Sequence, residues 1–132
     1  MNFEPEWLEE ATVRFFHQRQ LAEHGGIRGI RDDNMLMSAL AKPQQLWHYG
    51  SPPPDICQLA AAYAYGLAMN HPFLDGNKRT AAIACETFLI LNGRGFIIGE
   101  EEKYPVYLAL AAGQISESEF CSWLREHTKQ VE

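Results

Sequence analysis

The stretch from His71 to Thr80, with the sequence HPFLDGNKRT, concentrates the side chains best suited to chemistry. His71 is the group in it that can take up a proton near pH 7, since imidazole has an ordinary pKa of about 6.5. Asp75 offers the hard carboxylate oxygen that Mg²⁺ needs when the ion also contacts phosphates. These two residues predict a general base close to a magnesium ligand.

The four residues after Asp75 predict the start of a phosphate-binding helix. Gly76 lets the backbone approach a ligand closely, and the N–H groups of the first turn, from Asn77 onward, lack partners within the helix. Lys78 and Arg79 add formal positive charge, and arginine can bind phosphate oxygens through two parallel hydrogen bonds. The sequence therefore predicts a phosphate-ester or nucleotide site.

Each of these residues also has an ordinary structural interpretation. Asp75 and Asn77 could be helix caps, and His71 could be a polar residue at a helix end. Two successive cations at a helix N-terminus, however, oppose the helix dipole by roughly a few tenths of a kcal/mol or more. Because local rules tend to be broken at functional sites, Lys78 and Arg79 together favour a bound anion.

Two apolar helices are predicted on either side of this stretch. Asp55 caps a helix over residues 56–69, and a second helix runs over 77–91 and ends at Asn92-Gly93, a left-handed C-cap signal. Both are apolar around most of their circumference, which is typical of central helices. The connection between them is therefore expected to be an active-site loop joining two buried helices.

The remaining patterns are also helical, and strand signals are nearly absent. Helices are predicted from Pro5 to before Gly25, from Asp32 or Asp33 to before Pro43, over 103–112, and after a capping box formed by Ser116 and Glu119. Residues 44–54 have turn and polyproline chemistry and are predicted to form a loop or flap. The fold prediction is all-α: a compact bundle of about six helices forming a single domain over residues 1–132.

Composition excludes several classes of protein. The chain has 132 residues, of which 46% are hydrophobic and 21% charged, as in one globular domain. Its net charge of −6, without a basic face, argues against direct nucleic-acid binding. No apolar run approaches the roughly 20 residues of a membrane span, and the acidic start is unlike a signal peptide, so we expect a cytoplasmic protein. The odd, widely spaced cysteines Cys57, Cys85 and Cys121 predict buried, reduced thiols.

The motif HPFLDGNKRT resembles the signature of the Fic/Doc superfamily, and more closely its death-on-curing (Doc) branch, the toxins of type II toxin–antitoxin pairs. Further similarity lies at residues 24–32 (HGGIRGIRD), at 88–93 (FLILNG) and at 110–116 (LAAGQIS). These segments resemble the family's glycine-rich start, its Phe-Leu-x-x-Asn-Gly and its late Ala-x-Gly-x-Ile-Ser. The resemblance covers roughly residues 17–126.

The resemblance implies a helical fold and a nucleotide-dependent transfer to a protein hydroxyl. It implies that His71 is the general base that deprotonates the acceptor and that Asp75 binds Mg²⁺. It also implies that the phosphates of ATP are held by Gly76, Asn77, Lys78 and Arg79. In the Doc branch this pattern goes with a kinase that phosphorylates a threonine of elongation factor Tu and stops translation. The expected partner is a small antitoxin whose disordered tail folds onto an apolar groove.

Two alternatives to a kinase remain open. Fic proteins that transfer AMP carry Gly-Asn-Gly-Arg-x-x-Arg, whereas this chain has Lys78 for the second glycine and Ala82 for the second arginine. Gly76 stands where alanine is common in the Doc branch, so the motif lies between the branches and an adenylyltransferase is the first alternative. A non-catalytic, antitoxin-binding regulatory module is the second.

Two further features of the sequence are a segment of the predicted flap and the remaining histidines. The flap around residues 46–49 lies where related proteins clamp the target's backbone by strand addition, although an ordinary surface loop explains it equally well. The other histidines show no metal-ligand spacing and are interpreted as structural or solvent-facing; they are His17, His24, His48 and His127.

Overall fold

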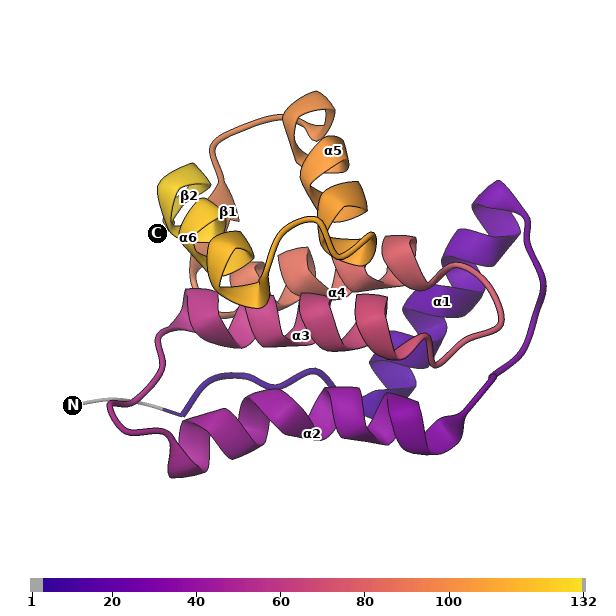
Figure 1. Ribbon diagram of the computed structural model, residues 1–132, viewed down its shortest axis with the longest axis horizontal. Helices are drawn as coiled ribbons and strands as arrows, with labels where there is room; N and C mark the ends of the chain where they lie inside the picture. Colours follow the sequence, from indigo (N-terminus) through magenta and orange to yellow (C-terminus); the bar gives the residue numbers. More distant parts are fainter. Residues whose placement is uncertain (1–3, 132) are drawn as a thin grey trace.

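The computed structural model of this protein describes residues 4–131, which are mostly helical. Its elements in chain order are α1 (Glu10–His24), α2 (Asp33–Tyr49), α3 (Ile56–Asn70), α4 (Asn77–Leu91), β1 (Arg94–Phe96), α5 (Glu100–Ala111), α6 (Glu117–His127) and β2 (Thr128–Gln130). The predicted all-α bundle of about six helices is confirmed (Figure 1). The short antiparallel pairing of β1 with β2, in which Gly95 lies opposite Lys129, goes beyond what the sequence patterns predict.

Helix α3 lies at the centre of the bundle, as predicted for residues 56–69. It packs against α2, α4, α5 and α6, and its buried side chains cover most of its circumference. Small residues let its neighbours approach closely: a Cβ added at Gly66 would lie 3.1 Å from the Cβ of Ala39 in α2. Helix α4 is covered less completely, since Ile90 and Leu91 at its end are exposed.

Helix α2 continues through Pro43 to Tyr49, so the predicted stop before Pro43 is wrong. Proline inside a helix costs about 3 kcal/mol, because it removes one N–H and crowds the preceding turn. Here Pro43 is buried, and Leu46 and Trp47 beyond it pack against the core. The predicted loop over 44–54 is wrong for residues 44–49, which are helical. Residues 46–49 therefore form neither an ordinary surface loop nor the extended edge that strand addition requires.

Helix α1 begins at Glu10 and not, as predicted, at Pro5. The preceding residues 4–9 are not helical, and a distant side chain binds their backbone. The side-chain oxygen of Asn92 accepts from the Glu6 N–H at 2.8 Å, and its amide nitrogen donates to the Glu6 carbonyl at 3.0 Å. The Glu6 carbonyl is an acceptor that a helix beginning at Pro5 would use, and the bond from Asn92 occupies it.

Helix α5 begins at Glu100, three residues before the predicted start, so that Pro105 lies in its second turn. Its first turn is acidic, which complements the helix dipole. The buried amine of Lys103 donates to Glu86 of α4 and to Glu100, each at 2.8 Å. The contact with Glu86 joins α5 to α4, whereas the contact with Glu100 lies within α5.

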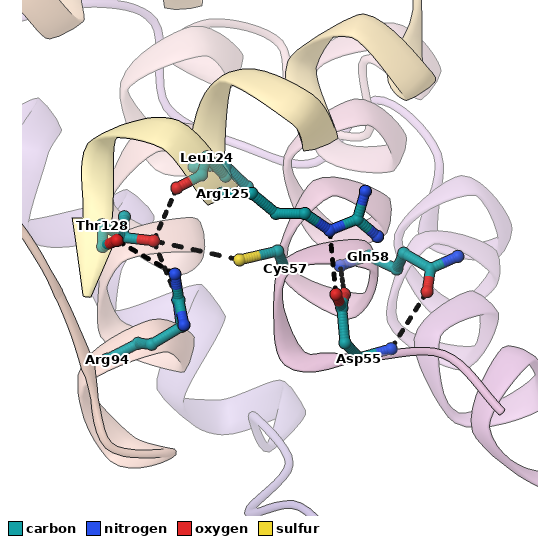
Figure 2. Close-up of polar contacts among 7 residues, drawn as sticks. All are labelled: Asp55, Cys57, Gln58, Arg94, Leu124, Arg125 and Thr128. Carbon is teal, nitrogen blue, oxygen red and sulfur yellow. Dashed lines mark hydrogen bonds and ion pairs between the residues drawn. The ribbon is translucent and has the colours of Figure 1, made fainter. Parts of the chain in front are cut away.

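The C-terminal end of the chain is attached to the start of α3 (Figure 2). The Thr128 hydroxyl donates to the Leu124 carbonyl at 2.5 Å and accepts from Nε of Arg94 at 2.8 Å. Arg125 donates to Oδ2 of Asp55 at 2.9 Å. This cluster lies at the end of α3 that is remote from the α3–α4 connection (Figure 1).

Replacing Asp55 by asparagine tests this attachment. Partial burial acts to raise the pKa of Asp55, but hydrogen bonds from Arg125 and from the Gln58 N–H outweigh it and hold that pKa below its ordinary value. The contribution to stability is therefore complete above the ordinary carboxyl pKa of about 3.9 and is lost as the pH falls through the folded-state value. Since the Asp55 side chain is 51% exposed, we expect a loss of less than about 1 kcal/mol at pH 7.

Asparagine also caps helices well, so the variant keeps the hydrogen bond to Gln58 and loses mainly the charge. Urea denaturation at pH 7 and near pH 3 measures the difference in free energy of unfolding between Asp55→Asn and the wild type. The difference should shrink at the lower pH. An equal difference at both values would contradict this account of the Asp55–Arg125 pair.

No helix within residues 4–131 is long and apolar enough to cross a membrane. The three cysteines Cys57, Cys85 and Cys121 are buried and unpaired, as predicted. Burial raises the pKa of the Cys121 thiol to about 11. Since the thiolate is the reactive form, this thiol is protonated and inert near neutral pH.

Candidate functional site

The α3–α4 connection lies at one end of the bundle, next to the segment that joins α1 to α2 (Figure 1). His71 directly follows α3 with φ 48° and ψ 57°, and it is the one non-glycine residue with positive φ among residues 4–131. This left-handed conformation costs a residue with a Cβ about 1–2 kcal/mol. Its neighbours must therefore hold the backbone there, while the imidazole is exposed.

The glycine-rich segment, residues 24–32, binds the backbone of the connection. The Arg31 guanidinium donates to the carbonyl oxygens of Asn70 at 2.6 Å and His71 at 2.5 Å. The Arg31 N–H donates to the Pro72 carbonyl at 2.8 Å. Arg31 thus donates hydrogen bonds to three consecutive carbonyl groups of the connection, and these bonds stabilise the strained turn at His71.

The centre of the connection is anchored in the core by Phe73. The Phe73 side chain is buried, and its backbone forms an isolated antiparallel bridge with Ile30. The Asn77 side chain accepts from the Phe73 N–H at 3.0 Å and donates to the Phe73 carbonyl at 2.9 Å. Asn77 therefore closes the turn with its side chain, and its backbone N–H is the group it can offer to a phosphate.

The first turn of α4 is not capped by any side chain of residues 4–131. Its N-cap is Gly76, with φ +79°, so neither Asp75 nor Asn77 has the ordinary capping role that was the structural alternative. Lys78 and Arg79 are exposed and form no ion pair within the described part of the chain. Free N–H groups and two cations without an ionic partner at a helix start are the features that favour a bound anion.

Asp75 lies directly beside this helix start with an exposed carboxylate. Its Oδ1 accepts from the Gly76 N–H at 2.9 Å, and its Oδ2 accepts from the Ile27 N–H at 3.1 Å. Gly26, with φ +130°, permits this approach, since a Cβ there would lie 2.9 Å from Oδ2. Residues 4–131 contain no group of three or more side chains with metal-ligand geometry.

Sequence reasoning missed the side chains that support the connection from α1. Gln20 is 2% exposed, and its Nε2 lies 3.4 Å from the Gly76 carbonyl oxygen. His17 is 4% exposed and contacts Asp75, so it does not face the solvent. The helical spacing places His17 and Gln20 on the face of α1 that buries Val13 and Leu21. This spacing was the signal in the sequence that could have identified them.

A cavity of about 370 Å³ adjoins the connection, between α1 and the glycine-rich segment. Arg14 and His17 of α1, Arg28 and Phe73 are among its lining residues. Its volume lies within the range of small-ligand sites. The candidate site thus combines an uncapped helix start, a carboxylate and an imidazole with an adjacent cavity.

Replacing Gly76 by alanine should lower the free energy of unfolding for two reasons. The left-handed φ costs about 1–2 kcal/mol with any Cβ, and the added Cβ would lie 1.8 Å from Nε2 of Gln20. Gly93→Ala is the matched control, because Gly93 has φ +82° and no neighbouring atom within 4 Å of a Cβ. Urea denaturation should show a larger loss in the free energy of unfolding for Gly76→Ala than for Gly93→Ala. Equal losses would mean that the Gln20 side chain can move away from the added Cβ without cost.

Two comparisons with known proteins bear on this site. The model of the Fic/DOC family matches residues 7–89, which contain the entire α3–α4 connection. The chain is also 44% identical over 69 residues to "Toxin Doc" of Mycolicibacterium smegmatis. That similarity covers 52% of this chain and 53% of the relative, so the chain spans about half the length of the curated relative it matches. Since the family model matches well over half of the chain, including the connection, the protein belongs to the Fic/DOC family.

Proposed function

We propose that this protein is a toxin-type protein kinase of the cytoplasm, which transfers a phosphoryl group from ATP to a hydroxyl of a translation factor. The observation that carries the proposal is the uncapped start of α4, where the exposed cations Lys78 and Arg79 follow closely after the exposed imidazole of His71. Membership of the Fic/DOC family and the similarity to "Toxin Doc" support it. By resemblance, the target is a threonine of elongation factor Tu.

In the proposed reaction, the imidazole of His71 takes the proton of the acceptor hydroxyl. The acceptor oxygen forms a bond to the γ-phosphorus while the bond from that phosphorus to the β–γ bridging oxygen breaks, and ADP leaves with the electron pair. The free N–H groups of α4, together with Lys78 and Arg79, bind the phosphate oxygens and stabilise their charge. Positioning and charge stabilisation of this kind are the main contributions of enzymes to phosphoryl transfer.

The donor set next to the helix start fits Mg²⁺. Magnesium bound together with phosphates takes one or two carboxylates and keeps several waters, so the single exposed carboxylate of Asp75 is sufficient. When bound, the ion would neutralise phosphate charge. Asp75 would hold it, and the N–H groups of Ile27 and Gly76 orient that carboxylate.

Lys78 favours phosphoryl over adenylyl transfer. A lysine in place of a second glycine removes a close backbone approach and fills that space with charge, which changes how a triphosphate can lie. AMP transfer remains the second candidate because Gly76 departs from the alanine common in the Doc branch. In that reaction the acceptor oxygen would attack the α-phosphorus and pyrophosphate would leave.

Labelled ATP separates the two reactions. Purified protein and elongation factor Tu are incubated with Mg²⁺ and ATP labelled at either the α- or the γ-phosphate, and the target is then analysed by mass spectrometry. Label transferred from the γ-position, with a phosphoryl adduct, is the expected result. Label from the α-position, with an adenylyl adduct, would establish the second candidate and reject the kinase.

The growth of cells after induction distinguishes an enzyme from a non-catalytic module that an antitoxin binds. Induction of the wild-type protein without a small antitoxin should stop growth, and induction of His71→Ala should not. Equal growth with both would favour the module and reject the enzyme. Pulse labelling with an amino acid then tests whether the arrest is one of translation.

A further inference from the structure

The buried imidazole of His17 is bonded to the α3–α4 connection and not to its own helix. Nε2 of His17 lies 2.8 Å from the backbone carbonyl oxygen of Asp75, 58 residues further along the chain. A carbonyl oxygen can only accept a hydrogen bond, so Nε2 must carry the proton and donate it. This tautomer follows from the partner alone.

The His17 ring also lies flat on the side chain of Phe73. The ring centroids are 3.8 Å apart and the planes meet at 7°, and both residues are almost entirely buried. His17 therefore contacts the connection at two residues, on either side of the exposed Leu74. One contact fixes a side chain in the core, and the other fixes a backbone carbonyl.

The peptide unit between Asp75 and Gly76 is consequently held at both of its polar groups. Its carbonyl oxygen accepts from His17, and its N–H, on Gly76, donates to Oδ1 of Asp75 at 2.9 Å. This unit leads into Gly76, the N-cap of α4, and the Cα of Asp75 that bears the carboxylate adjoins it. Its rotation would move both the anion-binding N–H groups and the carboxylate.

We infer that His17 is a positioning residue for the phosphate-binding start of α4. It acts by fixing the peptide unit between Asp75 and Gly76, and it takes no part in proton transfer. The inference rests on the proposed function for its effect on catalysis, whereas its effect on the conformation of the connection does not depend on that function. A residue that only filled the core could be replaced by an apolar ring of similar shape without consequence for transfer.

Two substitutions distinguish the stacking of the His17 ring from the hydrogen bond that its Nε2 donates. His17→Phe keeps a stacked ring and removes the hydrogen bond, and His17→Gln places an amide N–H near the position of Nε2. His17→Phe should lower kcat about 10- to 100-fold, since small misplacements of reacting groups cost that much, and should melt within a few degrees of the wild type. His17→Gln should keep a kcat within about threefold of the wild type, since its donor keeps the peptide unit in place.

Thr128→Val is the matched control, because it removes a buried hydrogen-bonding side chain at the remote end of α3 (Figure 2). It should lower the melting temperature and leave kcat per folded molecule unchanged. Wild-type kcat and KM for ATP in a folded His17→Phe would overturn the inference. If His17→Phe does not fold, His17→Asn takes its place, since its shorter amide cannot reach the Asp75 carbonyl.

A second readout keeps this test separate from the proposed function. In ¹⁵N-labelled protein without nucleotide, the backbone amide signals of residues 75–79 should shift in His17→Phe and stay in place in Thr128→Val. If the wild type transfers no group to any target, the proposed function fails while these shifts still decide the role of His17. Unmoved signals in His17→Phe would overturn that role even if the wild type is an active kinase.

Discussion

Removing the imidazole of His71 is expected to lower the rate of transfer to the target about 10²- to 10⁴-fold, which is the usual contribution of a positioned general base. The dissociation constant for ATP should change little, because the His71 side chain forms no hydrogen bond within the described chain and, in the proposed site, the start of α4 binds the phosphates. Single-turnover kinetics measures the transfer rate, and calorimetry with ATP measures binding.

The choice of substitution matters because His71 is left-handed. His71→Ala removes the base, but alanine has no polar side chain that could stabilise the left-handed conformation by a local hydrogen bond. Asparagine is tolerated in this conformation, so His71→Asn removes the base and preserves the turn held by Arg31. We expect the same loss of rate with both variants.

His48→Ala is the control, because it removes another exposed imidazole, near the end of α2. It should transfer at the wild-type rate. If His71→Asn also transfers at the wild-type rate with purified target, His71 is not the base. If it loses ATP binding in proportion to rate, His71 binds nucleotide instead.

Replacing Asp75 by asparagine is expected to weaken binding of ATP in the presence of Mg²⁺ by at least about 10-fold, since even the partners of metal ligands often contribute that much. The amide is neutral and nearly isosteric, so the loss reports the charge of the carboxylate. Without the metal, in EDTA, removing a negative charge next to the phosphates should leave ATP binding unchanged or make it tighter.

The dependence on metal is the critical measurement. An asparagine amide cannot accept from both the Gly76 and the Ile27 N–H groups, so a general distortion of the connection would weaken binding in both buffers. Calorimetry with and without Mg²⁺ separates the two causes. Asp55→Asn, the same substitution at the remote end of α3, should bind like the wild type. Identical titrations for Asp75→Asn and the wild type in Mg²⁺ would reject the metal role.

Local rules in the sequence were sufficient for most of the helices. Asp32 caps α2 by accepting from the N–H groups of Asn34 and Met35, and Ser116 forms the predicted capping box with Glu119 at the start of α6. These interactions connect residues at most three positions apart, so a short window of sequence contains all that they need. The order of apolar residues likewise determined that α3 is central.

The errors in the predicted boundaries come from contacts between distant parts of the chain. Pro43 ends a helix by its local preference, but burial of Leu46 and Trp47 continues α2 past it. Pro5 favours a helix start, but Asn92 binds the backbone next to it. In both places packing and long-range hydrogen bonds contribute more free energy than the local preference, which is the usual reason for such overrides.

The groups proposed for the chemistry of the candidate site could be identified from ten consecutive residues, because His71 and Asp75 lie in the α3–α4 connection and Lys78 and Arg79 follow in the first turn of α4. Its conformation was not readable, since the groups that hold it come from α1 and the glycine-rich segment. His17 lies 58 positions from Asp75 and Arg31 lies 40 positions from His71, and no local pattern pairs them. The sequence alone thus indicated which groups we propose to take part in the reaction. Tertiary packing decided that His71 is left-handed, that Asn77 closes the turn, and that no side chain of the described residues caps the start of α4.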